Sequence, residues 1–334
     1  MVVFFLLSFI ISLVLTFLIR RIAVRYKVVD VPDGGRKRHS RAVPLLGGVA
    51  IFLAFWMTVG YVVFFHPIFG IERLSAKLLA AFVASVIIMM VGVLDDVRPF
   101  SAWWRLVFTG VATAMAIWLG ITLEKITNPW GGFFALSLMV GNVVVWFWLM
   151  GIMYATKIVD GLDGLATGVV AIGAMMIYFL TQTAKFYQPN VGLLALVFAG
   201  ACLGFLVFNF YPAKIFLGES GGLFIGFILG VLAVISGGKV ATALLVVAVP
   251  VLDLARVIYQ RVRHRKSMFQ GDREHLHFQL LDYGFSERQV VIMYYIISAF
   301  FGATALFLQS TQKLVALFLL MLAMVVLGWK LSVK

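Results

Sequence analysis

Apolar stretches of about 20 residues recur along the whole chain, and this repetition restricts the fold more than any other feature of the sequence. A helix of that length is sufficient to cross the hydrocarbon core of a bilayer. Only 12% of the residues are charged, whereas soluble globular proteins carry about 25%. The sequence therefore predicts an all-α, polytopic membrane protein.

We expect about eleven transmembrane helices in a single domain covering residues 1–334, because no stretch between the segments is long enough for a soluble domain. The first segment has neither a basic leader nor a small-residue cleavage site, so we expect a membrane helix and not a signal peptide. The single Cys202 supports neither a disulfide framework nor a cysteine-based metal site. The segments are 2–22, 45–65, 76–94, 103–122, 133–152, 165–183, 191–210, 222–236, 239–262, 289–308 and 313–331.

The positive charges predict the orientation of these segments. With the N-terminus outside and the sides alternating, 21 of the 27 Lys and Arg residues fall on the inner side, which marks that side as cytoplasmic and places the C-terminus there. Basic loops beside anionic lipid also account for the net charge of +13, so we expect no nucleic-acid partner. Twelve of the 14 acidic residues fall on the inner side as well, although the orientation rule does not act on acids. We therefore expect the chemistry on the cytoplasmic face.

Two pairs of aspartates lie at the inner ends of segments. Asp95 and Asp96 are adjacent in GVLDDVRPF, and adjacent carboxylates repel, so one of them needs a proton, a basic partner or a metal. An ordinary helix end with Arg98 as partner would also explain the pair. In KIVDGLDGLATG, Asp160 and Asp163 would share one face of a helix, and the glycines would let a ligand approach the backbone. Asp163 could instead be an ordinary helix cap.

A third motif, FNFYPAKIFLGESGG at 208–222, combines a glycine-rich turn with Glu219. The start of the helix after such a turn offers free N–H groups to a phosphate. The acidic residue suggests a divalent cation that bridges protein and phosphate. Glycine-rich connectors without any function are also common between membrane helices.

The longest polar stretches lie at 23–44 and 263–288. Within residues 265–284, His275 and His277 stand beside Arg273 and favour contact with an anionic phosphate, and the absence of a third His or Cys from these residues argues against zinc. The basic residues of both stretches could serve only topology or anchoring to the inner leaflet. Taken together, the five motifs on one face favour Mg²⁺-assisted chemistry on a diphosphate.

In this order, LDD, DGLDGLATG, FNFYPAKIFLGE, PVLDLARV and DREHLH resemble the polyprenyl-phosphate N-acetylhexosamine-1-phosphate transferases, glycosyltransferase family 4, over essentially the whole chain. The resemblance implies transfer of a sugar 1-phosphate from a UDP-sugar to undecaprenyl phosphate with release of UMP, dependent on Mg²⁺ or Mn²⁺. It implies a multi-pass protein of the bacterial inner membrane that acts in synthesis of a cell-envelope glycan such as lipopolysaccharide or teichoic acid. A homodimer is left open. The active site would lie on the cytoplasmic face, in loops near 23–44, 95–102, 153–164, 211–221 and 263–288.

The resemblance also implies residue roles. Asp95 and Asp96 would be catalytic, one of them taking a proton from the lipid phosphate, and Glu219 with Asp96 would bind the metal. Asn209 and Phe216 match positions that contact uracil. The full substrate-binding set would be Lys157, Asp160, Asp163, Asn209, Phe216, Arg273, His275 and His277.

Three departures from the family pattern affect sugar choice and metal geometry. The family's Asn-Ala-x-Asn is replaced by residues Tyr154 to Lys157, its metal-binding Asp by Glu219, and the His after HLH by Phe278. RKRHSRAVPLLGG and DREHLH are typical of the enzymes that transfer GlcNAc 1-phosphate. The alternative within the family is transfer of phospho-N-acetylmuramoyl-pentapeptide, whose enzymes usually carry Pro-Thr-Met-Gly-Gly.

Three readings outside this reaction compete with it. A secondary transporter would place its ionisable groups near the midplane, often at helix breaks in internal repeats, but here the acids lie at inner segment ends and no repeat is obvious. A CDP-alcohol phosphatidyltransferase would need an Asp-Gly-x-x-Ala-Arg signature, which DGLDGLATG lacks. A noncatalytic lipid-carrier binding protein is supported only by the departures at Tyr154, Lys157 and Glu219.

Overall fold

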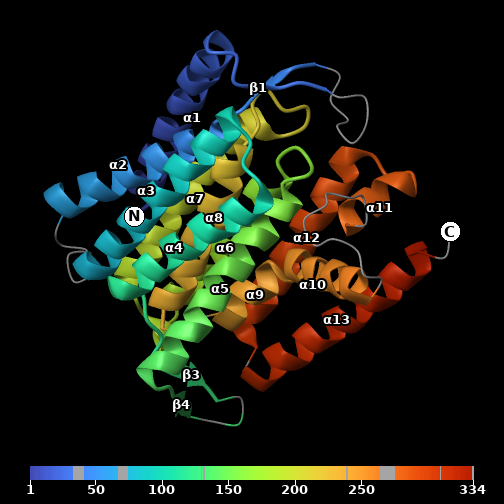
Figure 1. The fold of residues 1–334 in the computed structure, drawn as a ribbon. Helices are drawn as coiled ribbons and strands as arrows, with labels where there is room; N and C mark the ends of the chain where they lie inside the picture. Colours follow the sequence, from blue (N-terminus) through green and yellow to red (C-terminus); the bar gives the residue numbers. More distant parts are fainter. Residues whose placement is uncertain are drawn as a thin grey trace.

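The computed structural model describes residues 1–32, 41–66, 74–128, 130, 132–237, 240–263, 275–308 and 310–332. Helices dominate this part of the chain, as the apolar segments predict (Figure 1). They are α1 (Val2–Arg25), α2 (Gly47–Phe65), α3 (Ser75–Val97), α4 (Ala102–Trp118), α5 (Leu138–Val159), α6 (Leu165–Gln182), α7 (Pro189–Asn209), α8 (Gly218–Ile235), α9 (Val240–Val246), α10 (Ala248–Arg263), α11 (Leu276–Asp282), α12 (Glu287–Phe307) and α13 (Ser310–Ser332), with a 3₁₀ turn at Ala184–Phe186.

Eight of the described helices are long and apolar enough to cross a membrane, namely α1, α2, α3, α5, α6, α7, α8 and α12. The chain is therefore an all-α polytopic membrane protein. The other three predicted segments correspond to α4, which has 17 residues, to α9 with α10, and to α13, whose apolar part is Thr311–Leu322. The predicted number of eleven spans and the orientation of the termini stay predictions.

The segment 239–262 is not one helix, contrary to the prediction. It is divided into α9 and α10 between Val246 and Ala248. Pro250 explains the division, because proline has no N–H to give to the carbonyl of Val246 and its ring would clash with that carbonyl in a continuous helix. The break places Pro250 in the first turn of α10, where a missing N–H costs least.

Helix α8 is the centre of the bundle. It is buried from Ser220 to Ile235 and packs against α2, α3, α5 and α6. Two contacts are so close that they exclude larger residues: a Cβ on Gly48 would lie 2.2 Å from Gly221 Cα, and a Cβ on Gly92 would lie 2.3 Å from Ser220 Cα. The N-terminal turn of α8 is therefore held between α2 and α3.

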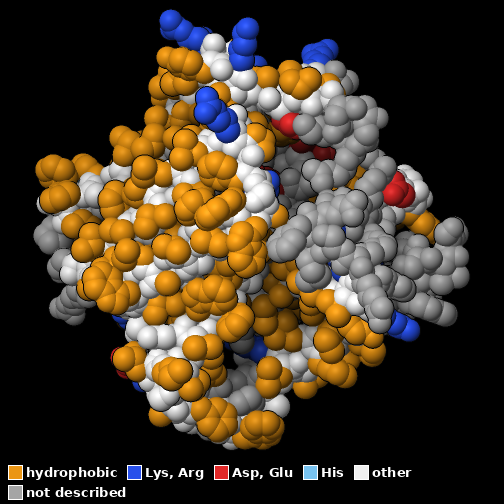
Figure 2. All heavy atoms as spheres, in the orientation of Figure 1, with side chains coloured by type: hydrophobic (Ala, Val, Ile, Leu, Met, Phe, Trp, Pro, Cys, Tyr) orange, Lys and Arg blue, Asp and Glu red, His pale blue; other side chains and the backbone are white. Residues whose placement is uncertain are grey.

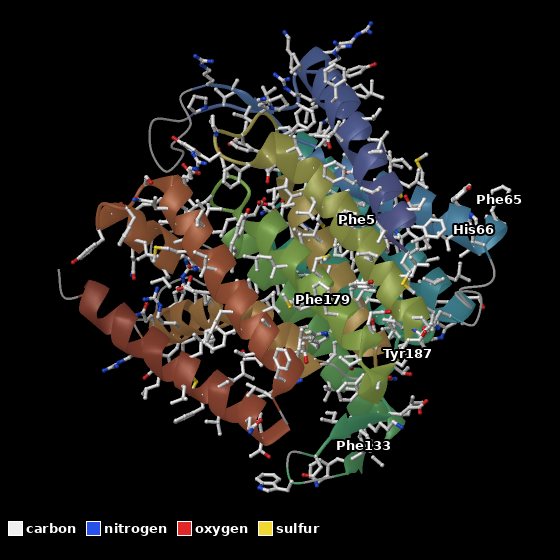
Figure 3. All side chains as sticks on the ribbon, turned by 180° about the vertical axis from the view of Figure 1, so that it is seen from behind. Phe5, Phe65, His66, Phe133, Phe179 and Tyr187 are labelled. Carbon is white, nitrogen blue, oxygen red and sulfur yellow. The ribbon has the colours of Figure 1, made fainter. Side chains whose placement is uncertain are left out.

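Two short antiparallel hairpins, which the hydropathy pattern gives no sign of, mark opposite ends of the bundle. β1 (Val29–Asp30) pairs with β2 (Val43–Pro44) at the upper end in Figure 1, and β3 (Lys125–Thr127) pairs with β4 (Phe133–Ala135) at the lower end. Seen from behind, Phe133 of β4 marks that lower end (Figure 3). Figure 2 shows several Lys and Arg side chains at the β1 end and apolar side chains over the helices below it. The β1 end is therefore where the positive-inside rule would place the cytoplasm.

Candidate active site

Asp95 lies at the end of α3 and pairs with Arg105 of α4, not with Arg98. The Arg105 Nε and Asp95 Oδ2 atoms are 3.0 Å apart, and the Asp95 side chain is only 3% exposed. Asp95 Oδ1 also accepts a hydrogen bond from the Phe100 N–H, while Arg105 Nη2 donates to the Phe100 carbonyl at 2.9 Å. Arg98 is exposed at the C-cap of α3. The pair joins α3 to α4 and fixes the loop between them.

Asp96 caps the N-terminus of α8. Its Oδ1 accepts a hydrogen bond from the Glu219 N–H at 2.7 Å, and its Oδ2 accepts from the Ser220 hydroxyl at 2.8 Å and the Ser220 N–H at 3.4 Å. These are two of the N–H groups that were expected to be free for a phosphate, and that expectation is wrong for these two groups because Asp96 accepts from both. A carboxylate from the same chain already satisfies the positive helix end. Gly218 makes this approach possible, because it has φ +80° and a Cβ there would lie 2.6 Å from Asp96 Oδ2.

Two of the departures from the family pattern meet in space. Lys157, in the last turn of α5, places its Nζ 2.6 Å from Glu219 Oε2, and Arg105 Nη1 lies 3.1 Å from Glu219 Oε1. Tyr154, which belongs to the same replaced motif as Lys157, has its ring centroid 5.7 Å from Lys157 Nζ. Its hydroxyl is 3.3 Å from Thr109 Oγ1. Glu219 is thus held between two cations from α4 and α5.

The DGLDG motif is a turn and not a helix, so the expected shared face for its aspartates does not exist. α5 ends at Val159 with Asp160 as its C-cap, and α6 begins after Gly164, which has φ +77°. Asp163 does not cap α6. Its Oδ2 instead accepts a hydrogen bond from the Ala213 N–H at 2.8 Å, so it ties the turn to the loop that precedes α8.

Asp160 is the acid of this site with the least compensation. Among the described residues its side chain makes no hydrogen bond or ion pair, and its Oδ2 lies near Gly222 of α8. Burial raises the pKa of Asp160 well above its usual range, and the charges of Glu219, Asp163 and Asp96 raise it further. An added cation would stabilise the ionised form of this carboxyl.

The donor chemistry around Asp160 fits a magnesium ion. Mg²⁺ binds oxygen ligands and is usually held by one or two carboxylates together with substrate phosphates. Asp160 and Asp96 offer such carboxylates, and neither has a basic partner within the described residues. No group of three acidic, histidine or cysteine side chains there forms a metal cage. The site therefore suits a cation that also needs oxygens from a bound phosphate.

Asn209 is the last residue of α7, and Phe216 lies in the loop before α8. Their polar groups make different hydrogen bonds. Asn209 is buried, donates from Nδ2 to the Ile215 carbonyl at 3.0 Å and accepts at Oδ1 from the Thr167 hydroxyl at 3.2 Å. Phe216 is partly exposed, and its N–H donates to the Pro44 carbonyl of β2 at 2.8 Å. Asn209 thus supports the loop before α8, and its contact with uracil stays a prediction.

A second polar cluster surrounds Asp253 of α10. Its Oδ2 lies 2.9 Å from His275 Nδ1, its Oδ1 lies 2.9 Å from Arg256 Nη2, and both oxygens accept from the Leu276 N–H at 3.1 Å. This carboxylate fixes the orientation of the His275 ring and the start of α11. Arg273 lies outside the described residues.

His277 connects this cluster to the DGLDG turn. Its ring stacks on that of His275 with centroids 5.8 Å apart, and its Nε2 is 2.6 Å from where a Cβ on Gly161 would be. The ring is fully buried, and neither nitrogen has a partner in the described part of the chain. Burial lowers the pKa of His277 to about 3, so the folded chain holds a neutral imidazole.

The structure brings Asp95, Asp96, Lys157, Asp160 and Glu219 together at the ends of α3, α5 and α8, at the β1 end of the bundle. Figure 2 shows acidic side chains in a recess near this end. Arg105 was not predicted as a site residue, although a charged residue within the apolar segment 103–122 is the kind of signal that marks one. The predicted site residues that the structure describes come from four separate regions of the sequence, near 95–96, 157–163, 209–219 and 275–277.

Comparison with known proteins identifies the family of the chain. Residues 78–237, which include the aspartate pair, the DGLDG turn and Glu219, match the model of glycosyl transferase family 4. The chain is 32% identical over 332 residues to a Bacillus subtilis protein named probable undecaprenyl-phosphate N-acetylglucosaminyl 1-phosphate transferase, covering 97% of this chain and 89% of that protein. The chain belongs to glycosyl transferase family 4.

Other members of the family are similar over most of their length. A Mycobacterium tuberculosis decaprenyl-phosphate N-acetylglucosaminephosphotransferase is 33% identical over 86% of this chain and 78% of its own. An Escherichia coli undecaprenyl-phosphate alpha-N-acetylglucosaminyl 1-phosphate transferase is 26% identical over 96% of this chain and 88% of its own. The similarity therefore extends across the helices that form both polar clusters, and this glycosyl transferase family 4 chain is a multi-pass membrane protein.

Proposed function

We propose that this chain transfers GlcNAc 1-phosphate from UDP-GlcNAc to undecaprenyl phosphate, with release of UMP. The observation that carries the proposal is the similarity, over 97% of the chain, to a protein named for this transfer. The site supports it, because acidic and basic side chains converge at the helix ends where a water-soluble donor and a lipid-borne phosphate could both arrive.

In this reaction one bond forms and one bond breaks. An oxygen of the lipid phosphate attacks the phosphorus that carries the sugar, and the bond from that phosphorus to the bridging oxygen of UMP breaks. Asp96 is the side chain that we assign to accept a proton from the lipid phosphate. Its hydrogen bonds to Glu219 and Ser220 fix its position, so it need not reorganise when the substrates bind.

A divalent cation, Mg²⁺ or in its place Mn²⁺, is part of the proposal. Asp96 and Asp160 would hold it together with phosphate oxygens of the donor, and when bound it would neutralise charge on the transferring phosphoryl group. Arg105 and Lys157 supply further positive charge from the chain itself at the same helix ends. His275 is held by Asp253 close to the same turn and would contact the sugar or its phosphate.

The described helices α9, α10 and α13 line a half-open apolar groove, a surface that suits a hydrocarbon chain. It has a volume of about 250 Å³ and is lined by residues of α9, α10 and α13 that include Val251, Leu252 and Phe318. The next residue along α10 is Asp253, which holds His275. We infer that part of the polyprenyl chain lies here, with its phosphate directed to the polar cluster. The β1 end of the bundle, where the acidic side chains lie, would then face the cytoplasm in the bacterial inner membrane, as the charge bias predicts.

Purified full-length protein in detergent should release UMP from UDP-GlcNAc only when undecaprenyl phosphate and Mg²⁺ are both present. The matched control omits the lipid phosphate. Failure to release UMP from UDP-GlcNAc, from other UDP-N-acetylhexosamines and from the muramoyl-pentapeptide donor would refute the proposal and favour a noncatalytic lipid-carrier binding protein. Release from the muramoyl-pentapeptide donor alone would instead favour the peptidoglycan reaction.

A further inference from the structure

Four charged side chains at the centre of the site alternate in sign. Lys157 pairs with Glu219 at 2.6 Å, Glu219 pairs with Arg105 at 3.1 Å, and Arg105 pairs with Asp95 at 3.0 Å. The chain of pairs crosses from α5 through α8 and α4 to α3. Its two positive and two negative charges cancel, so this row is neutral without any added ion.

In this row both carboxylate oxygens of Glu219 already have basic partners. A divalent ion placed at these oxygens would lie within ion-pair distance of both Lys157 and Arg105. Like charges at such separations repel strongly in a partly desolvated site. Asp96 and Asp160 lie next to the row but have no basic partner among the described residues. A cation is therefore attracted to those two carboxylates and repelled from Glu219.

The Lys157 ammonium has N–H donors that its ion pair with Glu219 does not use. It carries three N–H donors, and among the described residues Glu219 is the acid within ion-pair distance of it. The Lys157 side chain is 20% exposed, its Nζ lies 5.7 Å from the centroid of the Tyr154 ring, and its Cα passes close to Gly222. The same glycine is neighboured by Asp160 Oδ2. The Lys157 backbone and the Asp160 carboxyl thus border the same glycine of α8, and the Lys157 ammonium is directed by Glu219.

We propose that Lys157 binds the diphosphate of the donor directly, and that Glu219 is the positioning residue that aims Lys157 and is not a metal ligand. This inference rests on the proposed function, because it concerns the diphosphate of the same donor. Part of the positive charge that the diphosphate needs is then built into the chain. Binding of the nucleotide diphosphate should consequently persist, at lower affinity, when no divalent cation is present.

The first test measures binding of UDP and of UMP to the full chain in detergent by titration calorimetry, in EDTA and in Mg²⁺. We expect wild-type protein to bind UDP in EDTA, and Lys157→Met to weaken that binding about 10-fold, the size of one charge-assisted hydrogen bond, with little effect on UMP. Lys157→Arg should restore part of the loss. Lys125→Met, which removes an exposed lysine from β3 at the other end of the bundle, is the matched control and should change nothing.

The second test measures Mn²⁺ affinity by the loss of the free-ion EPR signal in the presence of UDP. Asp160→Asn should weaken Mn²⁺ affinity about 10-fold or more, whereas Glu219→Gln, which changes only the local charge, should weaken it clearly less. The double variant Lys157→Asn with Glu219→Asp should make UDP binding strongly dependent on Mg²⁺. Glu219 keeps Arg105 in Lys157→Met, so we expect that variant to fold, and the wild-type comparison of UDP with UMP in EDTA needs no variant.

The outcomes separate this inference from the proposed function. UDP binding that Lys157→Met leaves unchanged, or Mn²⁺ affinity that Glu219→Gln weakens about as much as Asp160→Asn does, would overturn the inference while UMP release by the wild type still supports the transferase. Wild-type protein that binds UDP only with Mg²⁺ present would overturn it as well. Absence of UDP binding under every condition would count against the proposed donor and the inference together.

Discussion

Replacing Arg105 by Gln should destabilise the protein, because it removes the only basic partner that the described residues provide for Asp95. The Asp95 side chain is 3% exposed and lies 3.0 Å from Arg105 Nε. Removing one member of a buried ion pair costs about 3–5 kcal/mol when the other charge is left uncompensated. The Arg105 side chain is 22% exposed, and Asp95 keeps the Phe100 N–H, so we expect the loss to be nearer to about 2 kcal/mol.

The assay is thermal unfolding in detergent, followed by the fraction of protein that stays monodisperse after heating. Arg98→Gln is the matched control, because it removes the same kind of charge from an exposed position seven residues earlier and should cost less than about 0.5 kcal/mol. Arg105→Lys should recover part of the stability, since a cation returns to the site without the second and third hydrogen bonds.

A double-mutant cycle isolates the pair itself. Asp95→Asn in the Arg105→Gln background should be less destabilising than Asp95→Asn alone, with a coupling free energy of about 1–3 kcal/mol. If Arg105→Gln unfolds at the same temperature as Arg98→Gln, the Asp95 carboxylate does not depend on Arg105 and the reasoning from burial is wrong. Unfolding temperatures that are additive around the cycle would lead to the same conclusion.

Three further predictions follow from other parts of the site. Asp96→Asn should lower UMP release about 100-fold or more while the protein still folds, because the amide oxygen can still accept from the α8 N-terminus but cannot take a proton; near-normal turnover would remove Asp96 from the mechanism. Stability should fall as pH drops from about 6.5 towards 3, by up to about 1.4 kcal/mol per unit, since unfolding frees His277 to take up a proton that its folded pKa of about 3 excludes; His277→Gln should flatten this profile, and an unchanged profile would contradict the assignment. Gly48→Ala should cost about 1–3 kcal/mol by pushing α2 away from α8, whereas Gly60→Ala on the same helix, where a Cβ meets nothing within 4 Å, should cost almost nothing, and equal unfolding temperatures would refute the close contact.

The helices and the clustering of the motifs could be predicted from the sequence because both follow from local patterns. Hydropathy alone locates the eight long helices, since a bilayer leaves the backbone few alternatives to helix. Alternation of sides then brings Asp95, Lys157 and Glu219 to one face without any knowledge of packing. The break before Pro250 was also readable in principle, because proline acts on the residues next to it.

The partners of the charged groups could not be predicted, because they depend on which helices are neighbours in space. Arg105 is ten residues from Asp95 and 114 residues from Glu219, and no sequence pattern ranks it above Arg98 as a partner. The same limit explains the error at α8. A glycine-rich helix start predicts an anion, but the sequence does not show that Asp96 of α3 is that anion.

The order in which the chain is made has a consequence for how α8 completes the site. Asp95 and Arg105 can pair as soon as α3 and α4 have entered the membrane, but Asp96 and Lys157 receive their partners only when residues 218–220 arrive, more than 60 residues after Lys157. A chain that stops before α8 therefore lacks the ion-pair partner of Lys157 and the hydrogen-bond donors of Asp96, whereas a chain that continues through α8 has both, so the site is completed by a single helix.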